Sequence, residues 1–329
     1  FFFASKMASA AVGGSGRIDV SRPRYPQDTF TGRLKHMFST TNPLLVFTSS
    51  TKLYEAKAIV DAYKKKEEPA GVTEEQIWQA KTLVDSAFHP DTGELNNAVG
   101  RMSFQVWGNM TITGIMLAFN TDFRMVILSQ WLNQSFNAFA NYTNRNASST
   151  LSTSTLLKSY VLATSGAVTA ALSLNHLIAS SATLSKGRHL PRFVPITAIG
   201  IGNCINIPLM RSSELANGIL VKDANGKEVG KSKDAAKQAI TKVVFSRIAM
   251  AVPSLVLPFY ILEPFEKPGR LLHKHPALRP VGMTLIAGAC LSFATPFACA
   301  IFPQEDSMKT KGTDLDGCGT DVVYFNKGL

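Results

Sequence analysis

The sequence predicts an all-α, polytopic membrane protein with about five transmembrane helices and an N-terminal helical extension. Long windows without Asp, Glu, Lys or Arg crowd residues 101–304. Most of them approach the ~20 residues that a helix needs to cross a hydrocarbon core. Residues 20–100 instead combine charged side chains with apolar ones at helical spacing, which is typical of helices with one buried face.

The basic composition excludes some classes of function. The chain has 329 residues and a formal net charge of +11, and its basic residues gather in the extension and the loops. There they influence membrane orientation and contact anionic lipids. No basic stripe with interleaved aromatic residues occurs, so we expect no nucleic-acid partner. The four cysteines lack the spacing of a metal centre, so we expect neither a metal site nor another cofactor.

The N-terminal third divides at about residue 20. We expect residues 1–19 to be disordered, because they carry neither the apolar run of a secretory signal nor the pattern of a cleaved transit peptide. Residues 20–100 are predicted to form a soluble helical extension. Leu53, Ile59 and Tyr63 lie on one face of its first helix, and Thr73 with Gln76 forms a capping-box pattern that begins the next.

A turn-rich segment lies between this extension and the first charge-free window. It contains His89, Pro90, Asp91 and Glu94, and Arg101 follows at the expected membrane edge. Three of these side chains could hold a metal, but so short a loop with Pro and Gly gives three ligands no fixed frame. We therefore favour a turn in which Asp91 or Glu94 pairs with Arg101 and acts as a gate.

The predicted membrane domain occupies residues 101–304. Its charge-free windows are 102–121, 125–144, 159–185, 193–210, 248–262 and 280–304. The first window carries Gln105, Asn109 and several hydroxyl groups, so it fits a re-entrant or interfacial segment as well as a span. Residues 211–246 are predicted to form a polar loop containing a hairpin, with Asn225 and Gly226 as its two-residue turn. Residues 305–329 are assigned to a C-terminal tail.

One predicted helix carries a row of amide side chains. Spacings of four, three, four and three residues place on a single stripe Gln130, Gln134, Asn137, Asn141 and Asn144. A buried amide without a partner costs on the order of 1–3 kcal/mol, so lipid does not contact this face. The amides either bind a neighbouring helix or line a water-accessible cavity that holds a polar solute. Five amides exceed what one helix contact needs, which favours the cavity.

A second cluster contains Asn203, Asn206 and Pro208. A proline inside a span predicts an interrupted helix, which frees backbone groups at membrane depth. Arg247 begins a later span, where it either extends to the surface or faces inward and binds a carboxylate. Amides offer donors and acceptors without charge, which suits a zwitterion, whereas a tricarboxylate calls for several inward cations.

Segments along the chain resemble the sideroflexins, a family of the mitochondrial inner membrane. The resemblance rests on residues 85–94, 100–103, 109–114, 130–145, 203–211, 235–241 and 323–329. It covers nearly the whole chain from about residue 20, except roughly 310–321, to which we assign no role. The family's Asn-rich motif carries over onto Asn133, Asn137, Asn141 and Asn144, and its His-Pro-Asp motif onto His89, Pro90 and Asp91.

The resemblance implies a carrier with about five transmembrane helices and no cleaved presequence. The better-known members move serine, with alanine and cysteine as related cargoes, and supply one-carbon metabolism. The amide row favours this cargo over the tricarboxylate (citrate) label that the family once had. Some members are also tied to iron homeostasis or iron–sulfur assembly.

We therefore predict a multi-pass transporter of small neutral amino acids, foremost serine, that works by alternating access in the mitochondrial inner membrane. Its partners are the substrate and membrane lipids, and homo-oligomerisation is left open. The rival prediction is a non-transporting scaffold for iron–sulfur or respiratory-complex assembly. An enzyme is not favoured, because no nucleophile–base pair occurs among the spans. Orientation stays open, because the extension and the 211–246 loop are both basic.

Overall fold

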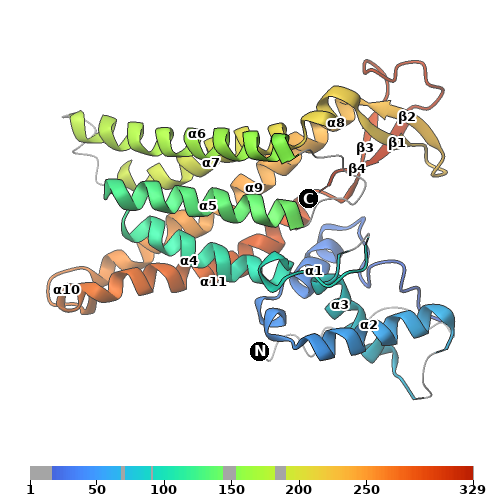
Figure 1. Cartoon of the computed structure of the whole chain (residues 1–329), viewed down its shortest axis with the longest axis horizontal. Helices are drawn as coiled ribbons and strands as arrows, with labels where there is room; N and C mark the ends of the chain where they lie inside the picture. The colour runs from blue at the N-terminus through green and yellow to red at the C-terminus, as the bar shows by residue number, and fades with distance from the viewer. Residues whose placement is uncertain (1–16, 68–70, 90–91, 144–152, 182–189, 329) are drawn as a thin grey trace.

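The computed structural model describes residues 17–67, 71–89, 92–143, 153–181 and 190–328. It confirms the predicted fold class, a polytopic helical membrane protein. A bundle of long helices forms the body of the molecule, and a helical extension and a small β-sheet lie at the same end of it (Figure 1).

Within the described residues the long helices of the bundle are α4 (Gln105–Ala118), α5 (Phe123–Thr143), α6 (Thr153–Ser180), α7 (Val194–Met210), α9 (Lys233–Leu262) and α11 (Arg279–Ile301). Three stretches are long and apolar enough to cross a membrane, namely Ser154–Ser180, Lys233–Phe265 and Pro276–Ile301, and α7 is a shorter apolar helix. Large apolar side chains such as Leu128, Leu162 and Phe293 are exposed on the outside of the bundle. Because lipid is as apolar as these side chains, this surface is suited to the bilayer.

The first window of the membrane domain forms a short helix. α4 has 14 residues and is therefore about 21 Å long, less than the ~30 Å of a hydrocarbon core. It packs closely on α11, because a Cβ atom added at Gly114 would lie 2.9 Å from the Cα atom of Thr284. Because α4 is too short to span a hydrocarbon core, its packing on α11 keeps it in place.

The extension consists of α1 (Phe30–Thr40), α2 (Ser50–Lys65) and α3 (Glu74–Ala87). The predicted capping box is present at the start of α3, with Thr73 and Gln76 bonding reciprocally. α1 packs on the end of α11, where the rings of Phe30 and Phe297 are 5.3 Å apart. Arg33 Nε also donates to the carbonyl oxygen of Ala300 at 2.9 Å. The extension is therefore anchored to the last residues of the bundle.

The sheet joins two segments that are far apart in the sequence. Its strands β1 (Ile219–Lys222), β2 (Glu228–Ser232), β3 (Glu305–Lys309) and β4 (Val322–Asn326) lie in the antiparallel order β2-β1-β4-β3. Residues 305–329, which we assigned to a tail, thus contribute half of the sheet. Val221, Val323 and Phe325 face inward and pack on Ala235 and Ala239 at the start of α9.

The predicted hairpin is present, but the prediction of a two-residue turn is wrong, because the loop is longer. Lys222 pairs with Glu228, and the backbone N–H of Asp223 donates to the carbonyl oxygen of Lys227 at 2.9 Å. The carboxylate of Asp223 accepts from the backbone N–H groups of Asn225 and Lys227. This side chain therefore stabilises a longer loop, in which Gly226 takes the left-handed conformation, φ +79°.

Residues 310–321, to which we assigned no role, cap α9. The carboxylate of Asp314 accepts from Ser232 Oγ at 2.6 Å and from the backbone N–H of Lys233 at 2.5 Å. A carboxylate at a helix N-terminus satisfies a free N–H group and complements the helix dipole. The C-terminal segment thus stabilises the beginning of a membrane helix.

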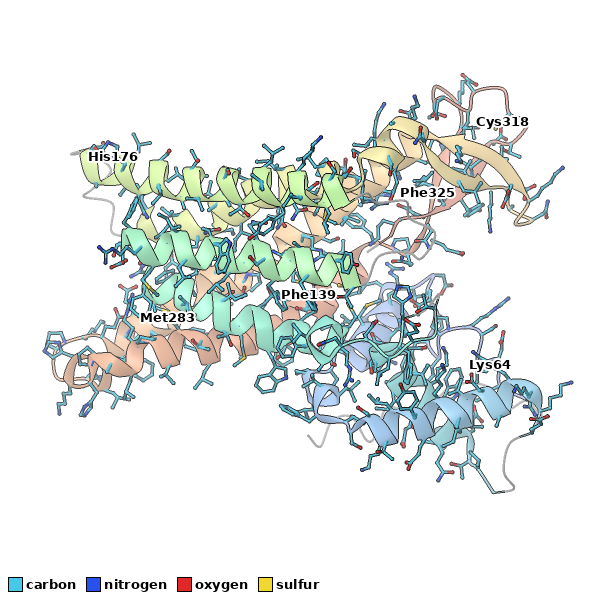
Figure 2. The ribbon with its side chains drawn as sticks, viewed as in Figure 1. Lys64, Phe139, His176, Met283, Cys318 and Phe325 are labelled. Atoms are coloured by element: carbon cyan, nitrogen blue, oxygen red, sulfur yellow. The ribbon has the colours of Figure 1, made fainter. Side chains whose placement is uncertain are left out.

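Short helices complete the chain: α8 (Ser212–Asn217), α10 (Leu271–Lys274), and the 3₁₀ helices Pro43–Phe47, Ala98–Gly100, Met102–Phe104, Leu190–Phe193, Glu263–Phe265 and Pro276–Leu278. Figure 2 places His176 and Met283 toward the end of the bundle away from the extension, and Phe139 toward the nearer end. Successive long helices therefore run in alternating directions.

Replacing Gly114 with Ala is expected to destabilise the protein by roughly 1–3 kcal/mol, the usual cost of overpacking a tight contact. The added methyl group would meet the backbone of Thr284 on α11. Thermal unfolding of the purified protein in detergent, followed by tryptophan fluorescence, measures the change. The matched control is Gly200→Ala, because a Cβ atom there meets nothing within 4 Å and alanine favours helix by up to ~1 kcal/mol. Equal melting temperatures for the two variants would contradict the close α4–α11 contact.

Candidate functional site

α5 turns part of its amide row into the bundle. Gln130 and Gln134 are each 1% exposed, Asn133 is 6% exposed, and Asn137 is half-buried. The side chain of Asn141 and all of Asn144 lie outside the described residues, so their positions stay predictions. The buried part of the row therefore begins in the middle of α5 and faces protein rather than lipid.

Gln134 packs against α7 at a position without a side chain. A Cβ atom added at Gly202 would meet the side-chain nitrogen of Gln134, and it would lie 3.4 Å from the Cβ atom of Ala167 on α6. Gly202 therefore makes room for the amide between the three helices. In the described part of the chain, neither the oxygen nor the nitrogen of that amide has a hydrogen-bond partner.

Other polar atoms around Gln134 share this property. Hydrogen-bond partners among the described residues are absent for Asn133 Nδ2, Thr164 Oγ1 and Asn206 Oδ1 as well. Asn206 lies one turn after Gly202 on α7, and Thr164 lies one turn before Ala167 on α6. We call the set Gln130, Asn133, Gln134, Thr164 and Asn206 the amide cluster.

The energetic cost of the amide cluster is substantial. A buried polar atom without a hydrogen bond costs about 1–3 kcal/mol, and native proteins contain only a few such atoms. If these residues only packed helices together, apolar side chains would stabilise the contact more, because they leave no buried polar atom without a hydrogen bond. The amide cluster therefore has unused capacity to donate and accept hydrogen bonds.

Gln130 lies at one edge of the amide cluster. Its side-chain nitrogen donates to the sulfur of Met116 at 3.6 Å, a weak acceptor, and its oxygen has no partner in the described residues. A cavity of about 10 Å³ adjoins it, lined also by Asn120 and Ser129. This volume is enough for about one water molecule. The arrangement is therefore a closed one, and helices must separate before a larger solute enters.

The predicted interruption of the helix at residues 203–208 is wrong. α7 continues from Val194 to Met210 with Pro208 inside it. Proline removes only its own N–H donor, and Pro208 lies in the last turn, so the helix loses one bond before it ends. Asn206 is 3% exposed and belongs to the amide cluster, whereas Asn203 and Pro208 are half-buried.

The segment with His89 and Glu94, which we predicted to act as a gate, forms a turn outside the bundle. The backbone N–H of His89 donates to the carbonyl oxygen of Glu94, and Lys57 Nζ donates to that of Gly93 at 2.6 Å. Glu94 is exposed and forms no ion pair with Arg101, which is 6% exposed and donates to the carbonyl oxygen of Asn96 at 3.1 Å. The pairing of Glu94 with Arg101 is therefore wrong. Pro90 and Asp91 lie outside the described residues.

Arg247 occupies an intermediate position on α9. Its side chain is half-buried. α9 and α11 pack along each other, so burial here comes from the neighbouring helix. An inward role in binding a carboxylate stays a prediction.

Two members of the amide cluster were not among the site residues predicted from spacing. Asn133 lies three residues after Gln130, so the rule that predicted the stripe also admits it. Thr164 lies within an apolar window of small and hydroxyl residues, where nothing in the sequence distinguishes it. Only the packing of α6 on α7 brings it to the site.

The matches of this chain to known proteins cover nearly its whole length. A family profile described as sideroflexins matches residues 19–329. Sideroflexin-1 of Rattus norvegicus is 46% identical over 320 residues, which cover 95% of this chain and 98% of the relative. Sideroflexin-1-3 of Drosophila melanogaster and Sideroflexin-3 of Homo sapiens are 44% and 43% identical with the same coverage. No solved structure matches the chain.

Gln134→Met should raise the melting temperature of the purified protein. The substitution keeps the length of the side chain and removes two buried polar atoms without partners, which cost about 1–3 kcal/mol each. Thermal unfolding in detergent measures the effect. Asn175→Leu is the control, because Asn175 Nδ2 donates to the carbonyl oxygen of Asn120 at 2.9 Å, and loss of that bond should lower the melting temperature. If the melting temperature of Gln134→Met also fell, Gln134 would instead form a stabilising contact between helices.

Proposed function

The chain belongs to the sideroflexin family, and from this premise we propose that it carries small neutral amino acids, foremost serine, across the mitochondrial inner membrane. One observation supports this proposal most directly. Uncharged polar atoms without partners are gathered in the interior of a helical membrane bundle. The family resemblance supplies the cargo, the compartment and the supply of one-carbon metabolism.

The chemistry of the amide cluster suits a zwitterion. Each amide offers two donors and a carbonyl acceptor without a charge of its own. It can therefore bond the carboxylate and the ammonium group of an amino acid, and Thr164 can bond the hydroxyl of serine. A cargo with zero net charge also avoids the large penalty of placing an unpaired ion in the bilayer.

A tricarboxylate is a poorer fit. Such a cargo needs several cationic side chains within the bundle, and α5, which carries most of the amide cluster, has Arg124 only at its exposed beginning. Arg247 on α9 is the cation that we propose for a carboxylate group, and one arginine matches one carboxylate. The balance of charge thus favours a monocarboxylic amino acid.

We propose that cargo moves by rearrangement of two groups of helices. α4, α9 and α11 form an apolar core, to which α7 adds Ile199 and in which Leu117, Leu255 and Met283 are 0% exposed. The amide cluster belongs to α5, α6 and α7 instead. Separation of these groups, together with movement of α5 away from α6 and α7, lets water and substrate reach the amide cluster. Alternating access from the two sides follows if the groups part at either end.

Asn137→Leu and Gln134→Leu are each expected to reduce saturable uptake of labelled serine into proteoliposomes by at least tenfold. Each variant removes a donor and an acceptor from the substrate path, and a single lost hydrogen bond in a desolvated site costs about 1–3 kcal/mol. Trp131→Phe is the matched control, because Trp131 lies on the same helix but is 48% exposed. It should transport like the unmodified protein.

The same assay separates carrier from scaffold. A scaffold for respiratory or iron–sulfur assembly would show no saturable flux of serine in any variant. Competition by alanine and cysteine but not by citrate is the expected pattern. Citrate flux equal to serine flux would contradict the proposed cargo. Absence of all flux would contradict the proposal that the protein is a carrier.

A further inference from the structure

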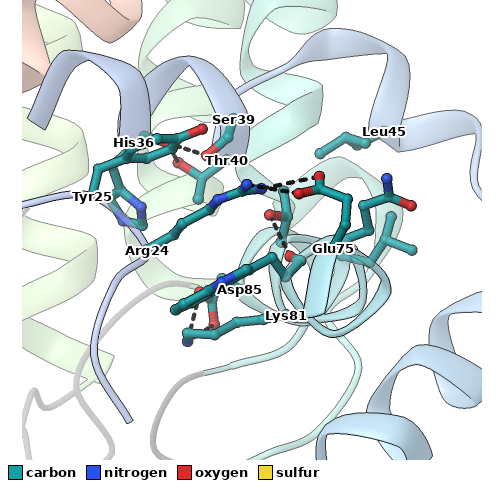
Figure 3. Close-up of a pocket in the computed structure, with 13 residues that line it drawn as sticks. Arg24, Tyr25, His36, Ser39, Thr40, Leu45, Glu75, Lys81 and Asp85 are labelled. Atoms are coloured by element: carbon teal, nitrogen blue, oxygen red, sulfur yellow. Dashed lines mark hydrogen bonds and ion pairs between the residues drawn. The ribbon is translucent and has the colours of Figure 1, made fainter. Parts of the chain in front are cut away.

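A cavity of about 350 Å³ lies outside the bundle, in the helical extension. It is enclosed by α1, α3 and the segment that precedes α1 (Figure 3). This volume is within the range of small-molecule sites and far exceeds the closed space beside Gln130. None of the transport steps proposed above uses it.

Charged side chains of both signs line this cavity in equal number. Arg24 binds Glu75 through both of its terminal nitrogens, at 2.7 and 3.0 Å. Lys81 binds Asp85 at 2.8 and 3.0 Å, and Asp85 begins the segment 85–94 of the family resemblance. Figure 3 shows both pairs among the side chains that line the cavity. A ligand with one net charge would therefore leave a charge unmatched, whereas a zwitterion can bind both signs.

These ion pairs can be exchanged at little cost. The side chains of Glu75 and Asp85 are 54% and 31% exposed, and ion pairs that water reaches contribute little to stability. A ligand carboxylate can therefore compete for Arg24 and Lys81, and a ligand ammonium group for Glu75 and Asp85.

The rest of the lining is apolar or uncharged. Trp78, Leu45 and Leu83 supply apolar surface. Burial lowers the pKa of His36, so its ring is neutral at pH 7 and offers one donor and one acceptor. No hydrogen bond of this ring to another described residue is present, so this capacity is available to a ligand.

We propose that this cavity is a binding site for a zwitterionic amino acid with a large apolar or aromatic side chain. Its carboxylate binds Arg24 and Lys81, its ammonium group binds Glu75 and Asp85, and its side chain packs on Trp78. Serine, which lacks an apolar side chain, fills little of this volume and makes little apolar contact with Trp78. The site is therefore distinct in selectivity from the proposed transport path.

The position of this cavity connects it with the bundle. His36 lines the cavity from α1, while Arg33 and Phe38 of the same helix contact the end of α11. A ligand that draws α1 toward α3 therefore acts on the helix that holds the extension to the last span. Occupancy is suited to regulating the bundle from outside the membrane.

Trp78 provides a direct test. The chain contains three tryptophans, so a Trp107→Phe/Trp131→Phe background leaves Trp78 as the single fluorescent reporter in the full-length protein. Titration with L-phenylalanine should change its fluorescence saturably. Phenylacetate, phenethylamine and N-acetylphenylalanine amide, which lack one or both charges, should bind at least tenfold more weakly, and so should serine.

Variants of this reporter protein supply the controls. Glu75→Gln and Lys81→Met should each weaken phenylalanine binding at least tenfold, whereas Lys64→Gln, on the exposed end of α2, should leave it unchanged. Melting temperatures check that the variants are folded. No saturable change with phenylalanine, or equal binding of phenylacetate, would overturn the proposal. The readout needs no flux, so its failure is distinguishable from failure of the transport proposal.

Discussion

A bilayer offers no water to polar groups, so each polar atom at membrane depth needs a partner within the protein. The backbone meets this constraint by forming helices. The side chains of Gln134 and Asn206 do not fully meet it, because both polar atoms of Gln134 and the Oδ1 atom of Asn206 are buried without partners in the described structure. The bundle compensates with the apolar core among α4, α9 and α11. This local violation is the observation on which the proposed site rests.

The parts outside the bundle are connected to it through helix ends. Arg33 donates to the last carbonyl groups of α11, and Asp314 accepts from the first N–H group of α9, that of Lys233. Both contacts satisfy backbone groups that a helix leaves free at its ends, and each places the charge that the helix dipole favours there. The extension and the sheet therefore share one end of the bundle, and movement of either one is transmitted to a membrane helix.

The predictions that hold rest on local spacing. Charge-free windows predicted the fold class, a polytopic helical membrane protein, and the Thr73–Gln76 pattern predicted the start of α3, because a cap depends on four consecutive residues. Two of the wrong predictions each inferred a local structure from a single residue. Pro208 does not interrupt α7, because it lies in the last turn, and Gly226 does not make a two-residue turn, because Asp223 organises a longer one.

The sequence by itself predicted a helix in the window 125–144 with amides on one stripe, since side-chain direction along a helix follows from its period. Only the tertiary structure decided what contacts this stripe. Gly202 of α7 lies against Gln134, with Ala167 of α6 beside it, and strands β3 and β4 join a hairpin from much earlier in the chain. The physical reason is that helix spacing specifies a face but not the neighbour that covers it, which depends on the packing of the whole bundle.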